Sequence, residues 1–97
     1  MSKGYWVVQY RSISDESAVK AYAALAGPAI RALGGRPLTT AGSQIEAHEA
    51  GLPRRTILIE FDTYDLARSA RQSEAYQNAL KALGSGAERD FRIVEGA

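Results

Sequence analysis

The segment Thr56-Ile57-Leu58-Ile59-Glu60-Phe61 is the most strand-like part of this 97-residue chain. Most of its side chains are β-branched or aromatic, and such residues favour a pleated, half-buried surface. Because side chains alternate between the two faces of a strand, Thr56, Leu58 and Glu60 share one face and the other face is wholly apolar. The pattern predicts a strand that the protein core covers on one side.

Three other strands are predicted around this segment. Residues 5–11 alternate in the same way, and residues 91–95 form the last strand of the chain. From Arg36 to about Glu49 the pattern is looser, with an interruption at residues 41–43. We therefore expect a long, irregular second strand there.

A first helix is predicted between the first two strands. Ser14-Asp15-Glu16 offers capping side chains at its start, and apolar residues then recur every three or four positions. Gly34-Gly35 ends the helix, because glycine tolerates the left-handed conformation beyond a helix C-terminus. Gly27-Pro28 lies inside it and predicts a kink or a short break.

A second helix is predicted after the third strand. Asp62-Thr63 caps its start, and Gly84-Ser85-Gly86 ends it. The apolar positions between these limits keep helical spacing, with Ser73 as a notch between two segments.

The order of elements predicts an α+β, ferredoxin-like βαββαβ fold, formed as a single domain by residues 1–97. Right-handed connections place both helices on one face of a four-stranded antiparallel sheet and leave the other face open. The open face carries both apolar and charged residues, namely Tyr5, Val7, Gln9, Arg11, Thr56, Leu58, Glu60, Arg92 and Val94. Neither a solvated face nor a sealed core normally has this mixture. We therefore expect a homodimer in which a second copy covers the face, with a pocket at or beside the interface.

Composition excludes several classes of protein. Twelve Lys and Arg against eleven Asp and Glu give a net charge of +1, which argues against a dedicated nucleic-acid binder. The chain has no Cys, so it has no disulfide, thiolate metal site or cysteine nucleophile. The apolar run at residues 5–8 is too short for a signal peptide or membrane span, and we expect a cytoplasmic protein without membrane contact.

His48 and Glu60 are the candidate catalytic residues. His48 is the only histidine and has the ordinary pKa of a general base, although a half-exposed residue at a strand end is the alternative. Glu60 lies in an apolar strand, where burial raises a carboxyl pKa unless Arg11 or Arg92 pairs with it. A raised pKa favours proton transfer, and an ion pair favours a structural role.

The candidate ligand-binding residues are Arg11, Arg92, Gln9 and Tyr5, all on the open face. A guanidinium group binds a carboxylate through two parallel hydrogen bonds, so the two arginines favour an anionic ligand. Their alternative role is the structural ion pair with Glu60.

Other polar residues receive structural interpretations. Tyr22 and Tyr76 are expected as core or interface aromatics whose hydroxyl groups reach the rim, and Arg54-Arg55 is expected on a solvated surface. Glu46, His48 and Glu49 lack the spacing of a metal site, and no motif indicates a cofactor. We expect neither a metal nor a cofactor.

Five short motifs, in order along nearly the whole chain, resemble the domain-of-unknown-function 1330 family: Lys3-Gly4-Tyr5-Trp6, Gly34-Gly35-Arg36, Ile59-Glu60-Phe61, Ser73-x-x-Tyr76-Gln77 and Ile93-Val94-Glu95-Gly96. The resemblance implies a dimeric α/β barrel, in which two ferredoxin-like protomers pair through their sheets. It implies no established reaction.

Two functional interpretations remain open, and the sequence does not decide whether the protein is an enzyme. In the first, the protein binds or converts a small, partly apolar or anionic metabolite in a pocket beside the sheet. By analogy of fold alone, dimeric α/β barrels include cofactor-free monooxygenases and small-molecule isomerases. In the second, it is a non-catalytic dimeric module that acts through assembly or contact with a partner.

Overall fold

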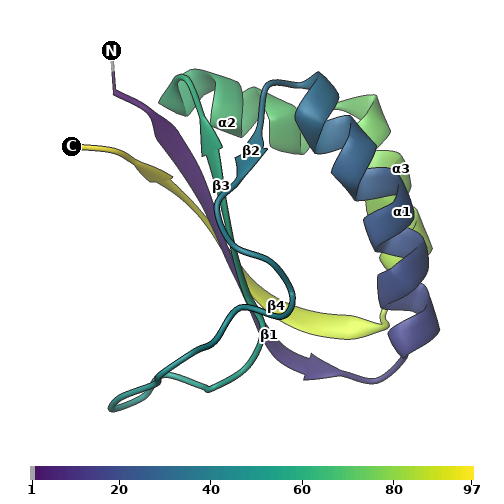
Figure 1. Ribbon diagram of the computed structural model, residues 1–97. Coiled ribbons are helices and arrows are strands. Elements are labelled where there is room, and N and C mark those ends of the chain that lie inside the picture. The colour runs from purple at the N-terminus through teal and green to yellow at the C-terminus, as the bar shows by residue number, and fades with distance from the viewer. Residues whose placement is uncertain (1) are drawn as a thin grey trace.

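A computed structural model describes residues 2–97 and arranges them as one sheet with helices on one of its faces (Figure 1). In chain order the elements are β1 (Gly4–Ile13), α1 (Glu16–Ala32), β2 (Arg36–Pro37), β3 (Thr56–Phe61), α2 (Tyr64–Gln72), α3 (Glu74–Leu83) and β4 (Ala87–Glu95). The four strands lie in the order β2-β3-β1-β4 and pair antiparallel. The predicted α+β class and antiparallel sheet are confirmed.

The register of β1 confirms which side chains share the open face. Val7 lies opposite Leu58 on β3 and opposite Arg92 on β4. Tyr5 lies opposite Glu60 and Val94 in the same way. Alternation along each strand then sends the intervening residues toward the helices.

The core lies between the sheet and the helices, and its centre is aromatic. Trp6 is fully buried and packs at ring-centroid distances of 4.8 Å from Tyr76, 5.1 Å from Phe61 and 5.1 Å from Phe91. Its indole N–H donates to the carbonyl oxygen of Ala67 at 2.8 Å, which ties β1 to α2. Such aromatic packing stabilises the fold beyond the area that it buries.

The helix ends follow the local signals in the sequence. The side chain of Asp15 accepts hydrogen bonds from the backbone at the start of α1, and that of Thr63 does so at the start of α2. Ser73 ends α2 and also caps α3, so the predicted notch is a complete break. Gly34 and Gly84 have φ angles of +90° and +51°, which favour glycine beyond a helix C-terminus.

Three expectations were wrong in detail. The second strand is only the two residues of β2, and the chain from Leu38 to Arg55 is a long loop, which first curves toward the helix side of the sheet and then extends away from the helices (Figure 1). The break at Ser73 gives three helices instead of two. Of the kink or short break predicted at Gly27-Pro28, the break does not occur, because α1 continues through Pro28.

None of the helices formed by residues 2–97 combines the length and the apolar character needed to cross a membrane.

Candidate functional site

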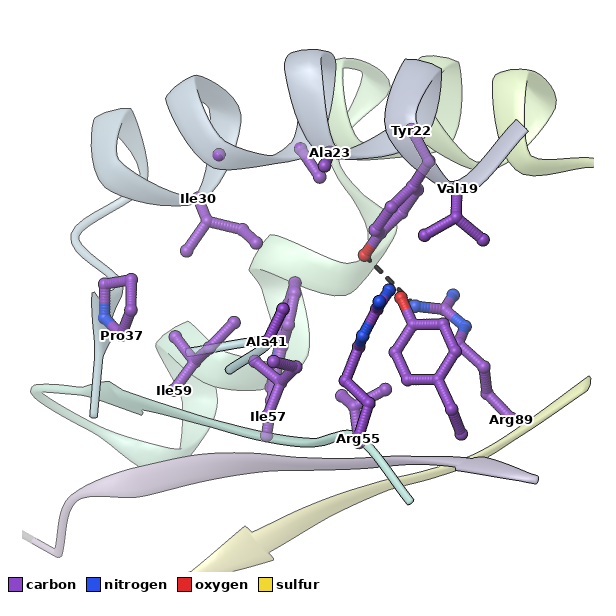
Figure 2. Close-up of a pocket in the computed structure, with 15 residues that line it drawn as sticks. Val19, Tyr22, Ala23, Ile30, Pro37, Ala41, Arg55, Ile57, Ile59 and Arg89 are labelled. Atoms are coloured by element: carbon purple, nitrogen blue, oxygen red, sulfur yellow. Dashed lines mark hydrogen bonds between the residues drawn. The ribbon is translucent and has the colours of Figure 1, made fainter. Parts of the chain in front are cut away.

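A cavity of about 190 Å³ lies between α1 and the inner face of the sheet (Figure 2). Its walls are mostly apolar, and Figure 2 shows Ile30 and Ile59 facing each other across it. Ala23 and Ala41 line it and are exposed, so the cavity reaches the surface between α1 and the loop 38–55. The site is a partly open apolar slot.

The cavity exists because the middle of α1 presents small side chains to the sheet. Ala23, Ala26 and Gly27 line it at this point, where larger residues would fill the space. Helix α1 packs along α3, whose Tyr76, Ala79 and Leu83 belong to the core. The two helices therefore hold one another in place while α1 leaves room above β1 and β3.

One end of the cavity is polar. Figure 2 shows Tyr22 on α1 facing Arg55 and Arg89, which point toward it from the sheet, while Pro37 lies at the opposite end. Arg89 Nη1 donates to the Tyr22 hydroxyl at 3.1 Å, and Nη2 donates to the Tyr76 hydroxyl at 3.5 Å. The guanidinium group also lies 4.8 Å from the ring centre of Tyr22. Cation–π attraction therefore adds to the hydrogen bonds that hold Arg89.

The two tyrosine hydroxyls form a hydrogen bond of 2.6 Å with each other. Each hydroxyl has one hydrogen, and Arg89 has only donors. One hydroxyl hydrogen is used within the pair, so the other has no acceptor among the hydrogen bonds formed by residues 2–97. Because Tyr22 lines the cavity and Tyr76 does not, a bond donated by Tyr76 leaves the Tyr22 hydrogen free for a ligand.

Tyr22 and Tyr10 are neutral donors at physiological pH. Burial raises the pKa of Tyr22, and the neighbouring Tyr76 raises it further. Burial also raises the pKa of Tyr10, which lines the cavity between the two arginines. The polar end therefore offers hydrogen-bond donors and positive charge, and no tyrosinate base.

No carboxylate balances Arg89 within the part of the chain that the structure describes: none of the ion pairs there includes it. None of the 15 residues that line the cavity is Asp, Glu or His. An arginine stays charged even when it is buried. The arrangement is suited to holding an anion with an apolar body, and it offers no general base of the usual kinds.

The candidate residue Glu60 lies on the open face, across the sheet from the cavity. Tyr5 donates to it at 3.2 Å, and Arg36 donates to it from Nε at 3.2 Å and from Nη2 at 3.0 Å. Lys3 approaches it to 3.7 Å. The hydrogen bonds from Arg36 lower the pKa of Glu60, which is therefore ionised at neutral pH.

Within one chain Glu60 pairs with neither of its expected partners, because the arginines on the open face pair elsewhere. Arg11 forms an ion pair with Glu88 at 3.2 Å, and Arg92 holds Asp90 through two hydrogen bonds of 3.0 and 3.2 Å. The first pair joins the neighbouring strands β1 and β4, and the second lies within β4; both are at the sheet surface. The structure thus brings Tyr5 and Glu60 together and keeps the two arginines apart from them.

The remaining candidates lie near or in the long loop. Gln9 donates to the carbonyl oxygen of Leu52 at 3.4 Å, which links the open face to the loop. His48 is exposed and pairs with Glu46. Among residues 2–97, no three His, Asp or Glu side chains gather as a metal site requires. Whether His48 or the open-face residues act on a ligand stays a prediction.

The residues of the cavity's polar end were missed for specific reasons. Arg89 precedes the predicted last strand, but β4 begins at Ala87, so Arg89 points inward together with Phe91 and Ile93. The signal was an arginine in phase with apolar residues of a strand. Arg55 was expected on a solvated surface and instead lines the cavity. The hydroxyls of Tyr22 and Tyr76 are buried against each other instead of reaching the rim.

Comparisons with known proteins agree with this fold. The family model described as a domain of unknown function, DUF1330, matches residues 3–97. A protein of unknown function from Rhodopseudomonas palustris has a TM-score of 0.76 at 14% identity, over 99% of this chain and 83% of that one. No curated protein matches the chain.

Two further solved structures share the fold at lower similarity. A dimeric ferredoxin-like protein of unknown function from Thermobifida fusca has a TM-score of 0.58 at 14% identity, over 97% of this chain and 91% of that one. A candidate antibiotic biosynthesis monooxygenase from Nitrosomonas europaea has a TM-score of 0.57 at 17% identity, over 98% and 89%. At these identities the likeness establishes the fold alone, and it confirms the ferredoxin-like prediction.

Proposed function

Because the chain belongs to the DUF1330 family, whose description names no activity, we propose a function from the cavity itself: the protein binds a small, largely apolar carboxylate. The observation that carries this proposal is Arg89, a partly buried cation at the polar end of an apolar cavity, which forms no ion pair with an acidic residue among residues 2–97. A carboxylate on Arg89 would supply the missing negative charge. It would also accept the free hydroxyl hydrogen of the tyrosine pair.

The dimensions of the cavity support a ligand of about the size of one substituted ring. An apolar cavity of roughly 150 Å³ is enough to hold benzene, and this one measures about 190 Å³. The ring would lie between Ile30 and Ile59, with its acid group toward Tyr22 and Arg89. Benzoate has this shape and serves as the probe.

The test compares three ring compounds of nearly equal size and different charge. We expect benzoate to bind, and the neutral benzamide and the cationic benzamidine to bind far more weakly. Trp6 lines the cavity and is the only tryptophan, so its fluorescence reports binding directly. Thermal stability gives a second readout, because a ligand that binds only the folded state raises Tm.

Matched arginine variants on β4 locate the anion. Arg89→Met should weaken benzoate binding by roughly 10- to 150-fold, since a hydrogen bond to a charged group contributes about 1.5–3 kcal/mol. Arg92→Met, on the opposite face of the same strand, should leave binding unchanged. If only Arg92→Met loses benzoate binding, the anion site lies on the open face. Equal binding of all three compounds by the wild type would refute the proposal.

We propose a second function, assembly through the open face, because this face exposes apolar side chains beside ion pairs. Val94 is 45% exposed, and Val7 and Leu58 are half-buried next to each other. The occupant is a second copy of the chain, and the dimeric description of the Thermobifida fusca protein supports this choice. In this interpretation the module acts as a homodimer without catalysis. A single 10.5 kDa species in concentrated solution would contradict it.

A further inference from the structure

Arg55 is a second cation at the polar end of the cavity, and the binding of a monocarboxylate leaves it unused. It is half-buried, lines the cavity, and also lines two outer hollows next to it. Its backbone carbonyl accepts a hydrogen bond of 2.9 Å from the Tyr10 amide, so the backbone is held where the long loop enters β3. None of the ion pairs within residues 2–97 includes Arg55.

Arg55 and Arg89 lie around the same aromatic ring. Their guanidinium carbons are 5.3 Å and 5.7 Å from the ring centre of Tyr10. Figure 2 shows both side chains directed toward Tyr22 at one end of the cavity, and the opposite end, beside Pro37, is apolar. Two positive charges therefore share one end, without any carboxylate among the residues that line the cavity.

We infer that the site selects dianions whose two acid groups lie on neighbouring atoms, with Arg89 holding one group and Arg55 the other. The inference rests on the proposed binding of carboxylates and makes Arg55 the residue that determines specificity. One acid group neutralises only one of the two guanidinium groups, whereas two adjacent groups neutralise both. A second acid group at the far end of the ligand would instead be buried among apolar side chains, which is unfavourable.

Isomers of one dicarboxylate separate this geometry from simple charge attraction. At about pH 7.5, where both carboxyl groups are ionised, phthalate carries them on adjacent ring atoms and terephthalate on opposite ones. We expect phthalate to bind the wild type about tenfold more tightly than benzoate, and terephthalate to bind more weakly than benzoate. Trp6 fluorescence measures all three dissociation constants in the same protein.

The neighbouring arginine provides the matched control. Arg55→Gln should remove the tenfold preference for phthalate and change benzoate binding by less than about twofold. Arg54→Gln should retain the preference, because Arg54 is exposed and lines an outer hollow but not the cavity.

The outcomes distinguish this inference from the proposal on which it rests. If benzoate binds and phthalate binds no more tightly, or terephthalate binds as well as phthalate, the selectivity for adjacent charges is wrong and the monocarboxylate site stands. If neither benzoate nor phthalate binds, the proposed function itself fails. An equal loss of phthalate binding in Arg54→Gln and Arg55→Gln would show general attraction to positive charge and would also overturn the inference.

Discussion

Two charged residues in this protein are stabilised in different ways. Glu60 is paired with Arg36 and Lys3 and accepts a hydrogen bond from Tyr5, so its charge is balanced within the fold. Arg89 is held by tyrosine hydroxyls and aromatic rings, which stabilise a cation without neutralising it. A balanced charge suits structure, whereas an unbalanced one beside a cavity is available to a ligand.

The pairing of Glu60 predicts an acid-dependent stability difference. Because its folded-state pKa is lower than the ordinary value of 4.5, its contribution to stability is full above that value and is lost as the pH falls through the folded-state pKa. Glu60→Gln should therefore be less stable than the wild type at about pH 7, and the difference should shrink by about pH 3. Urea denaturation at both pH values measures it. A stability difference that does not change with pH would contradict the ion pair. Glu95→Gln is the control, because Glu95 is exposed and lies outside the ion pairs of residues 2–97.

At the scale of elements, β1 and α2 lie in close contact at Gly4. A Cβ atom at Gly4 would lie 2.7 Å from the Cα of Tyr64 and 2.8 Å from the carbonyl oxygen of Thr63. These are backbone atoms at the start of α2, which cannot move without displacing the helix. The absence of a side chain at Gly4 therefore allows α2 to pack on β1.

Gly4→Ala should destabilise the protein by about 1–3 kcal/mol, the usual cost of overpacking. Gly42→Ala is the matched control, because a Cβ atom there would meet nothing within 4 Å. Its stability should stay within about 0.5 kcal/mol of the wild type. Urea unfolding followed by Trp6 fluorescence compares the two variants. Similar stabilities for both would show that the β1–α2 contact accommodates a methyl group at Gly4 without loss of stability.

At the scale of the whole molecule, the sheet separates two surfaces of different character. The helix side contains the core and the cavity, and the open side carries apolar residues bordered by ion pairs. The loop 38–55 lines the cavity with Ala41 and Arg55, and its far part extends away from the helices (Figure 1). Ile45 in this loop is 37% exposed. This division allows one side to hold a ligand while the other meets a second copy.

Val7→Glu should convert the proposed dimer to a monomer, because it places a carboxylate next to Leu58 at the middle of the open face. Leu25→Glu is the control, since Leu25 is 49% exposed on α1, away from that face. Light scattering should give twice the 10.5 kDa chain mass for the wild type and for Leu25→Glu, and the chain mass for Val7→Glu. A Val7→Glu variant that remains dimeric would place the interface elsewhere.

The sequence by itself determined most of β1, the whole of β3, the end of β4, the helix ends and the two faces of the sheet, because these depend on neighbouring residues. Alternation in 56–61 and the capping side chains of Asp15, Thr63 and Ser73 act over a few positions, and the structure agrees with each. The long second strand failed because the pairing with β3 stops soon after β2. The Leu38 amide still donates to the Leu58 carbonyl oxygen at 2.8 Å, but the following residues up to Arg55 form no strand, so no hydrogen-bonded ladder stabilises an extended chain there.

Only the tertiary structure decided which side chains meet. Tyr22 and Tyr76 are 54 positions apart, and Arg89 lies 67 positions from Tyr22, so no local pattern joins them into one polar end. The partner of Glu60 was likewise decided by the pairing of β2 with β3, which puts Arg36 opposite Glu60. Side-chain contacts of this kind depend on how distant elements pack, because local periodicity specifies the face of a residue and not its neighbour across the fold.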